Sequence, residues 1–232
     1  MASTIQTPPV LYEDNHLLAL NKPAGLATMG TPAGEETLLT LAKQYIGRKY
    51  AKPGNVYLGV VSRLDVPTTG VVLFARTSKA ARRLNEQFRQ RKVEKVYWSI
   101  VEGTLELPEG ELCDFLGEDE RHRRMRIVGR ELTGAKQARL AYHCIRTIGS
   151  DSLIEVRPMT GRKHQIRLQF SHLGHPVLGD RKYGSSRRFP RGIALHARRL
   201  AVSHPVGGTV VELHAPVPSD WPDVLRDETS AD

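Results

Sequence analysis

The stretch YLGVVSRLDVPTTGVVLFA, residues 57–75, carries the strongest local signals in the sequence. Its apolar ends, Tyr57–Val61 and Val71–Ala75, predict two β-strands, because each is a short apolar run bounded by turn residues. The polar segment between them, Ser62–Gly70, contains Pro and Gly and predicts a loop. Loops held between strands commonly carry catalytic or binding residues, so the loop is the first place to look for a site.

Asp65 lies in this loop, two residues after Arg63. A carboxylate beside a cation stays ionised near neutral pH, so Asp65 has the chemistry of a nucleophile or a base. On spacing alone, a structural ion pair in a surface turn is the commoner explanation of the two residues.

Elements on both sides of this stretch indicate the fold class. The predicted strands cover residues 10–13, 16–21, 95–101, 138–147, 152–157, 194–202 and 209–214, and the predicted helices cover residues 37–50, 78–91 and 163–173. Thr37 and Ser78 are the expected N-caps of the first two helices. Because short turns join most neighbouring strands, we expect an α+β protein with a mixed, mostly antiparallel sheet and flanking helices. With no repeat and no linker, a single domain over residues 1–232 is expected.

The predicted strand 95–101 places Tyr97 on one face of the sheet. Val96, Trp98 and Ile100 alternate with it and would fill the buried face. Tyr97 therefore points away from Trp98, either as an ordinary strand residue or as part of a site.

Composition narrows the class of protein. The chain has 232 residues, a formal net charge of +9 and a pI near 9.8. An excess of Lys and Arg favours a polyanionic partner, although solubility alone also explains it. No apolar run approaches the length of a bilayer span and no leader segment is recognisable, so a cytoplasmic protein without a membrane role is expected.

The basic segment TGRKHQIR, residues 160–167, lies at a predicted loop-to-helix junction. Helix N-termini attract anions through backbone donors and the helix dipole, and adjacent cations strengthen that attraction. Arg162, Lys163 and His164 are therefore candidate contacts to a phosphate or a carboxylate. The alternative is a basic helical turn that is simply solvated. This alternative is less favourable, because basic charge at a helix N-terminus opposes the helix dipole.

Two further basic clusters indicate nucleic acid. One comprises Arg121, Arg123, Arg124 and Arg126, and the other comprises Arg181, Lys182, Arg187, Arg188 and Arg191 with Tyr183 and Phe189 interleaved. Guanidinium groups suit phosphates, and aromatic rings stack on bases that are splayed out of RNA loops. Arg187 and Arg188 are the candidate RNA contacts in the second cluster.

Metal and cofactor motifs are missing from the sequence. The nine histidines show no H-E-x-x-H or similar spacing, and Cys113 and Cys144 belong to no C-x-x-C pair. Neither a phosphate loop nor a G-x-G-x-x-G or G-x-S-x-G motif occurs. We therefore expect no metal and no nucleotide cofactor.

Five motifs follow one another along the chain: Arg63-Leu64-Asp65 with Thr68-Thr69-Gly70, Glu94-Lys95-Val96-Tyr97, residues 160–167, residues 172–180 (HLGHPVLGD) and Leu195-His196-Ala197. Together they resemble the motifs of RluA-type pseudouridine synthases, and the likeness runs from about residue 10 to about residue 220. The turn at Asn21-Lys22-Pro23-Ala24-Gly25-Leu26 also resembles that family's N-terminal turn.

The resemblance implies a site and a reaction. In this family Asp65 would be the catalytic carboxylate, with Arg167 as the cation paired with it and Tyr97 stacked on the target uracil. Arg63 would fill the space left by a flipped uridine. The family's reaction needs no cofactor, its substrate is rRNA or tRNA, and many of its enzymes are monomers. We see no separate N-terminal RNA-binding module of the kind that some of them carry.

The chain also departs from the family pattern. Ser62 stands where the family usually has His, Thr69 where it has Ser, and Lys163 where it has a small hydroxyl residue. These changes affect subfamily and substrate contacts more than the chemistry. An RNA-binding protein of the same fold without catalysis is the main alternative, and only product chemistry separates the two.

Overall fold

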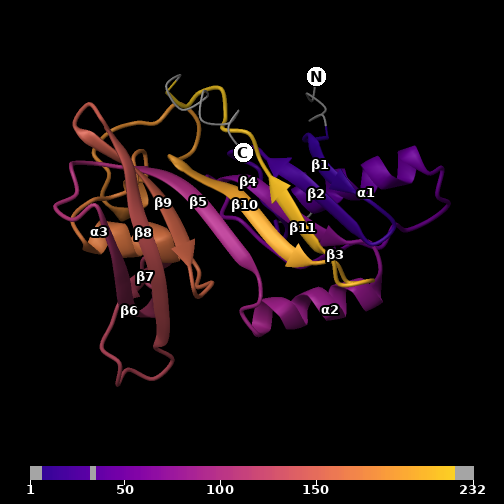
Figure 1. The fold of residues 1–232 in the computed structure, drawn as a ribbon, viewed down its shortest axis with the longest axis horizontal. Coiled ribbons are helices and arrows are strands. Elements are labelled where there is room, and N and C mark those ends of the chain that lie inside the picture. Colours follow the sequence, from indigo (N-terminus) through magenta and orange to yellow (C-terminus); the bar gives the residue numbers. More distant parts are fainter. Residues whose placement is uncertain (1–6, 32–34, 223–232) are drawn as a thin grey trace. The chain divides into compact units, whose positions relative to one another are not determined.

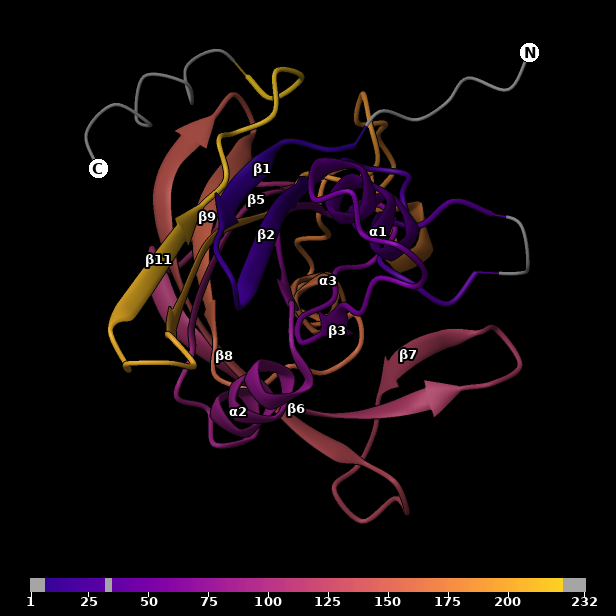
Figure 2. The ribbon, with the colours of Figure 1, turned by 90° about the vertical axis from the view of Figure 1, so that its right-hand side faces the viewer.

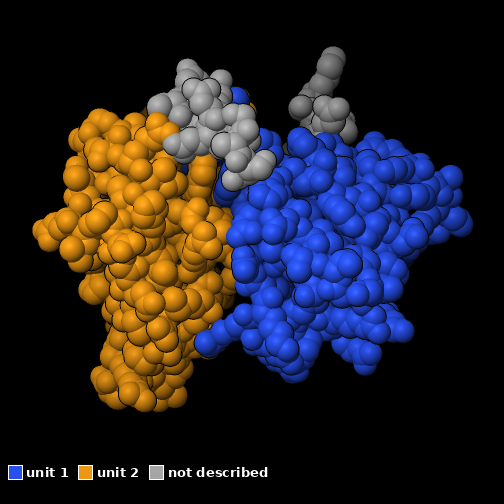
Figure 3. Space-filling model, viewed as in Figure 1, with its two compact units in different colours: residues 1–94, 197–232 blue, residues 95–196 orange. Residues whose placement is uncertain are grey.

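The structure, a computed structural model, describes residues 7–31 and 35–222. The chain divides into two compact units, which Figure 3 distinguishes by colour. Unit 1 combines residues 1–94 with residues 197–232, and unit 2 comprises residues 95–196. The chain passes from one unit to the other twice, at residues 94–95 and 196–197. The expected single domain over residues 1–232 stays a prediction.

Unit 1 contains the strands from both ends of the chain. Strands β1 (Val10–Glu13) and β2 (Leu17–Lys22) form the predicted antiparallel hairpin, and β2 pairs antiparallel with β4 (Thr69–Ala75). The short β3 (Gly59–Val60) also pairs with β4, and β11 (Val210–His214) pairs with β10 (Leu195–Ser203), most of which lies in this unit.

Two helices cover opposite faces of β2 and β4 (Figure 1). Leu18 and Leu20 pack with α1 (Leu38–Lys49), whereas Leu17 and Ala19 pack with α2 (Ser78–Arg89). Successive side chains of a strand point to opposite faces, so a strand covered on both sides must be apolar throughout. That requirement explains the apolar run Val71–Ala75, which makes up most of β4.

Unit 2 is an antiparallel sheet in the order β5-β9-β8-β6-β7. Its strands are β5 (Glu94–Val101), β6 (Glu109–Asp119), β7 (Arg124–Ile127), β8 (Lys136–Ile148) and β9 (Asp151–Pro158). Helix α3 (Gln165–His172) packs Ile166 and Phe170 against this sheet, and the 3-10 turn η1 (Arg181–Tyr183) follows. Figure 2 shows the hairpin of β6 and β7.

The predicted α+β class is confirmed, with differences at element ends. The N-cap of α2 is Thr77, one residue before Ser78, because the Thr77 side chain accepts the backbone N–H of Ala80. Helix α3 begins at Gln165 rather than at residue 163, since His164 has a left-handed backbone with φ of 55°. The predicted strand 57–61 is shortened to two residues.

Strands β6 and β7 were not predicted. Only two of the eleven residues of β6 are buried, and the rest alternate between exposed and half-buried, so the local sequence lacks a clear apolar face. Eight paired positions with β8 hold β6 in place instead. None of the helices within residues 7–31 and 35–222 is long and apolar enough to cross a membrane.

Candidate active site

The loop that carries Asp65 connects β3 to β4 and is anchored at several points. Ser62 Oγ accepts a hydrogen bond from the backbone N–H of Leu73 in β4 at 2.8 Å. Thr28 Oγ1 donates to the carbonyl of Leu64 at 3.0 Å and accepts from the Leu64 N–H at 3.2 Å. The carbonyl of Asp65 accepts the N–H of Thr68 at 3.0 Å. The backbone on each side of Asp65 is therefore fixed, while Asp65 itself is half-buried.

Lys22, the last residue of β2, anchors the same loop from within unit 1. Its side chain is fully buried, and Nζ donates to the carbonyls of Pro23 (2.9 Å), Leu26 (2.8 Å) and Val66 (3.1 Å). Burial lowers the pKa of Lys22 to about 7, and the negative charge of Asp65 acts in the opposite direction. Lys22 thus fixes the residue that follows Asp65 and interacts electrostatically with its carboxylate.

Lys22 was not among the site residues expected from the sequence. In the sequence analysis Lys22 appears only as one residue of the turn 21–26 that resembles the family's N-terminal turn. Its chemistry depends on burial, which the sequence does not state. The available signal was a lysine two residues after the apolar run LLAL, residues 17–20, in a strand where a charged side chain needs internal partners.

Gly70, at the end of the Asp65 loop, permits a close approach of two strands. Its φ is +111°, and a Cβ placed there would lie 2.7 Å from the backbone nitrogen of Ala197 and 2.8 Å from its carbonyl carbon. Any larger residue would push the loop away from β10. The Gly that helped to predict a loop therefore also sets its position.

Arg63 is exposed next to this loop. Within the described part of the chain it has no hydrogen bond and no ion pair. Its guanidinium group is available to a ligand. Its role as a wedge stays a prediction.

In unit 2, Arg167 of α3 is held by Asp180. Its Nε lies 2.6 Å from Oδ2 and its Nη2 lies 2.9 Å from Oδ1, and both side chains are at most 5% exposed. The guanidinium also lies 5.1 Å from the ring centroid of Tyr183. A bidentate, buried pair of this kind fixes both the position and the charge of Arg167. The expected pairing of Arg167 with Asp65 joins residues of different units and stays a prediction.

The loop before α3 is ordered by Gln165. Its Oε1 accepts from Thr160 Oγ1 at 2.7 Å and from the N–H of Arg162 at 3.1 Å. Lys163 is exposed, with Nζ 3.5 Å from Oε1 of Glu118. These contacts present the predicted basic segment at the N-terminal end of α3.

The remaining predicted residues have different surroundings. His164 Nδ1 lies 2.7 Å from the hydroxyl of Tyr183, and Tyr97 is half-buried on the sheet face opposite the buried Trp98, as its alternation predicted. Arg187 forms ion pairs with Asp151 and Glu102, which raise the pKa of its guanidinium. The guanidinium donors of Arg187 are therefore already used by two carboxylates of the protein.

Arg188, by contrast, is exposed and has no polar partner among the described residues. The described residues contain no group of three or more His, Cys, Asp or Glu side chains that could hold a metal ion.

The chain is similar to known proteins over most of its length. A family model described as RNA pseudouridylate synthase matches residues 16–172. The ribosomal large subunit pseudouridine synthase D of Xylella fastidiosa is 36% identical over 228 residues, which cover 91% of this chain and 66% of that protein. The dual-specificity RNA pseudouridine synthase RluA of Haemophilus influenzae is 33% identical over 89% of this chain and 91% of its own length.

Among solved structures, human RNA pseudouridylate synthase domain containing 4 is similar. Its TM-score is 0.75 at 26% sequence identity, and the match covers 90% of this chain and 88% of that one.

Proposed function

Because the chain belongs to the family of RNA pseudouridylate synthases, we propose that it isomerises specific uridines of a structured RNA with Asp65 as the catalytic carboxylate. The family and the enzyme class that the motifs predicted, an RNA-modifying isomerase, are confirmed by the family match and by the relatives. The individual residue roles and the target RNA belong to the proposal.

The anchoring of the Asp65 loop is the observation that carries this proposal. A catalytic carboxylate needs a fixed backbone and a favourable charge environment, since small misplacements cost rate. Hydrogen bonds from Thr28, Lys22 and Gly25 hold the residues on both sides of Asp65. A surface ion pair in a turn would need none of this support.

The reaction breaks the bond between uracil N1 and ribose C1′ and forms a bond between C5 and C1′. The proton leaves C5 and N1 gains one, so atoms and electrons balance without a redox partner. Asp65 acts on the sugar or on the base in this sequence of steps. Tyr97 stacks on the uracil, and Arg167, charged and fixed by Asp180, offsets the carboxylate charge.

RNA contacts complete the proposal. Arg63 fills the space left by the flipped uridine, and Arg162, Lys163, His164 and Arg188 contact phosphates. Arg187 contributes indirectly by ordering its segment through Asp151 and Glu102.

The target we propose is an rRNA or tRNA stem-loop. The name of one relative, a ribosomal large subunit enzyme, supports rRNA, and the name of the other states a dual specificity for RNA. We further propose that the protein acts in the cytoplasm as a monomer.

The test is product formation by purified protein on total RNA from a strain that lacks the gene. We expect the wild type to form pseudouridine at a defined site, and Asp65→Asn to form none while it still binds RNA and unfolds at the same urea concentration. Product formation by Asp65→Asn would refute the role of the carboxylate. Tight RNA binding by the wild type without any product would instead favour a non-catalytic RNA-binding protein.

A further inference from the structure

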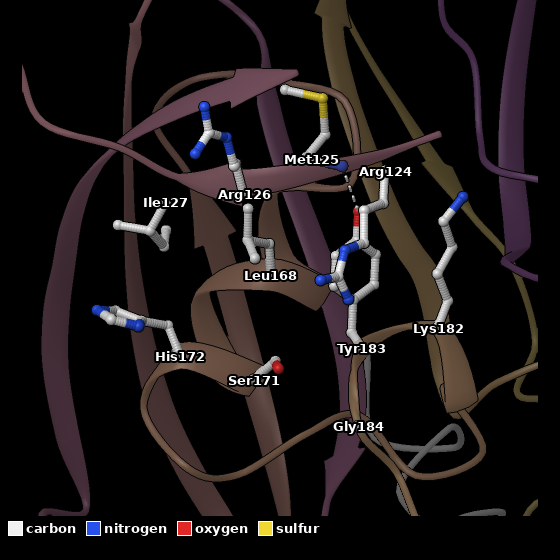
Figure 4. Close-up of a pocket in the computed structure, with 10 residues that line it drawn as sticks. All are labelled: Arg124, Met125, Arg126, Ile127, Leu168, Ser171, His172, Lys182, Tyr183 and Gly184. Carbon is white, nitrogen blue, oxygen red and sulfur yellow. Dashed lines mark hydrogen bonds between the residues drawn. The ribbon is translucent and has the colours of Figure 1, made fainter. Parts of the chain in front are cut away.

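Unit 2 contains a pocket of about 400 Å³ between β7, α3 and η1 (Figure 4). Four of the residues that line it are basic or can become so: Arg124, Arg126, His172 and Lys182. No Asp or Glu lines it. None of the residues proposed for catalysis lines it either.

Two of these side chains have unused donors. Arg126 and His172 are exposed and form no hydrogen bond or ion pair with any described residue. Arg124 has a 3.6 Å ion pair with Asp119, and Lys182 Nζ donates to the carbonyl of Arg123 at 2.6 Å. Arg124 and Lys182 are therefore held in position by other groups, whereas Arg126 and His172 have donors that a ligand can use.

The floor of the pocket is apolar. Leu168, Met125 and Tyr183 are 8%, 7% and 5% exposed and belong to one hydrophobic cluster. The Tyr183 hydroxyl accepts the N–H of Met125 at 3.0 Å, drawn as the dashed line in Figure 4, and lies 2.7 Å from His164 Nδ1. These contacts fix the Tyr183 ring. An apolar floor of fixed shape under a cationic rim suits a flat ring attached to a phosphate.

We propose that this pocket binds an unpaired nucleotide of the RNA substrate other than the target uridine. Its base packs against the apolar floor, and its flanking phosphates take the donors of Arg126 and His172. The volume lies in the range of small-ligand sites. The inference rests on the proposed function only in taking RNA as the ligand, because binding here requires no chemistry at Asp65.

The direct test uses a hexauridylate that contains one 4-thiouridine as a photocrosslinking probe. Irradiation should link it to peptides with residues 124–127, 171–172 or 182–184, and Asp65→Asn should give the same crosslinks. Crosslinks confined to other peptides would overturn the proposal. If pseudouridine formation fails while these crosslinks persist, the proposed function is wrong and the pocket assignment stands.

Three variants separate a nucleotide pocket from general attraction by charge. Arg126→Ala should weaken hexauridylate binding about five- to tenfold in 0.1 M salt. It should also reduce the steepness with which log of the association constant falls with log of the salt concentration, by about one unit of slope. Ser171→Trp, which fills the pocket from α3 without a change in charge, should weaken binding and leave the salt slope unchanged. The control Arg157→Ala removes an exposed arginine that already pairs with Glu155, and it should bind as the wild type does.

Equal losses for Arg126→Ala and Arg157→Ala would show that only net charge matters. Full displacement of the probe by millimolar inorganic phosphate would indicate an anion site without a base pocket. Either result would overturn the proposal. Comparison of Ser171→Trp with the wild type by circular dichroism establishes that a loss of binding does not arise from unfolding.

Discussion

Replacing Lys22 by Met tests the buried lysine that anchors the Asp65 loop. The substitution keeps the length and apolar stem of the side chain but removes the Nζ donors, which reach three backbone carbonyls as an ammonium and can serve two of them as a neutral amine. The carbonyl of Val66 keeps the N–H of Gly25 as a donor at 2.9 Å. The carbonyls of Pro23 and Leu26 lose the lysine donor, at a cost of about 1–3 kcal/mol for each.

The pH dependence is the diagnostic part of this prediction. In the unfolded chain Lys22 keeps its proton up to its ordinary pKa of 10.5, whereas in the folded state it releases the proton above a pKa of about 7. Between these values the unfolded state binds more protons, so the stability of the wild type rises with pH by about 1.4 kcal/mol per pH unit. Below pH 7 both states are protonated, and the full penalty of burying the charge applies.

The measurement is urea unfolding of the wild type and of Lys22→Met at pH 8.0 and at pH 9.5. Other titrating groups are common to both proteins and largely cancel in the difference between their free energies of unfolding. We expect that difference to change by about 2 kcal/mol in favour of the wild type over this interval. A difference that stays constant would refute the reasoning, because it would mean that the three carbonyl acceptors outweigh burial and keep the ammonium charged.

Two further predictions concern close contacts within each unit. Gly70→Ala should lower the free energy of unfolding by about 3 kcal/mol or more, because its Cβ would collide with the backbone of Ala197; Gly134→Ala, also at positive φ but with open space around it, should cost only about 1 kcal/mol in the same urea titration, and equal losses would contradict this account. Asp180→Asn should cost about 2–4 kcal/mol and reduce pseudouridine formation, because it removes a buried carboxylate from Arg167; unfolding and product assays that match the wild type would show that Asp180 has no such role.

Local signals predicted the elements that bury a continuous apolar face. The helix after Thr37 has the expected cap and buries Leu38, Leu41, Ala42 and Ile46 at helical spacing. Strand β6 was missed because it is held by pairing with β8, more than 15 residues further along the chain, and its own residues show no clear apolar face. Strand β7 was missed because it is a short edge strand paired only with β6, and its basic residues around Arg124 looked like a charged cluster. Pairing over long separations in sequence leaves little trace in either partner.

The site shows the same division between local and long-range information. The motifs led to the proposal of Asp65, Tyr97 and Arg167 as site residues, and the structure adds contacts that the motifs do not contain. Asp180 fixes Arg167, and Lys22 fixes the residue after Asp65. Both supports depend on burial and on side-chain reach, so they follow from the folded chain rather than from spacing.

Unit 1 takes its strands from the two ends of the chain, and this arrangement constrains its order of assembly on the ribosome. Leu17 and Leu73 share a hydrophobic cluster with Leu200 and Leu213. The first strands therefore leave the exit tunnel long before their last partners are translated, and all of unit 2 is synthesised in between. Until β10 and β11 emerge, part of the apolar surface of β2 and β4 lacks its final cover, and exposed apolar surface of this kind favours aggregation of a partly folded chain.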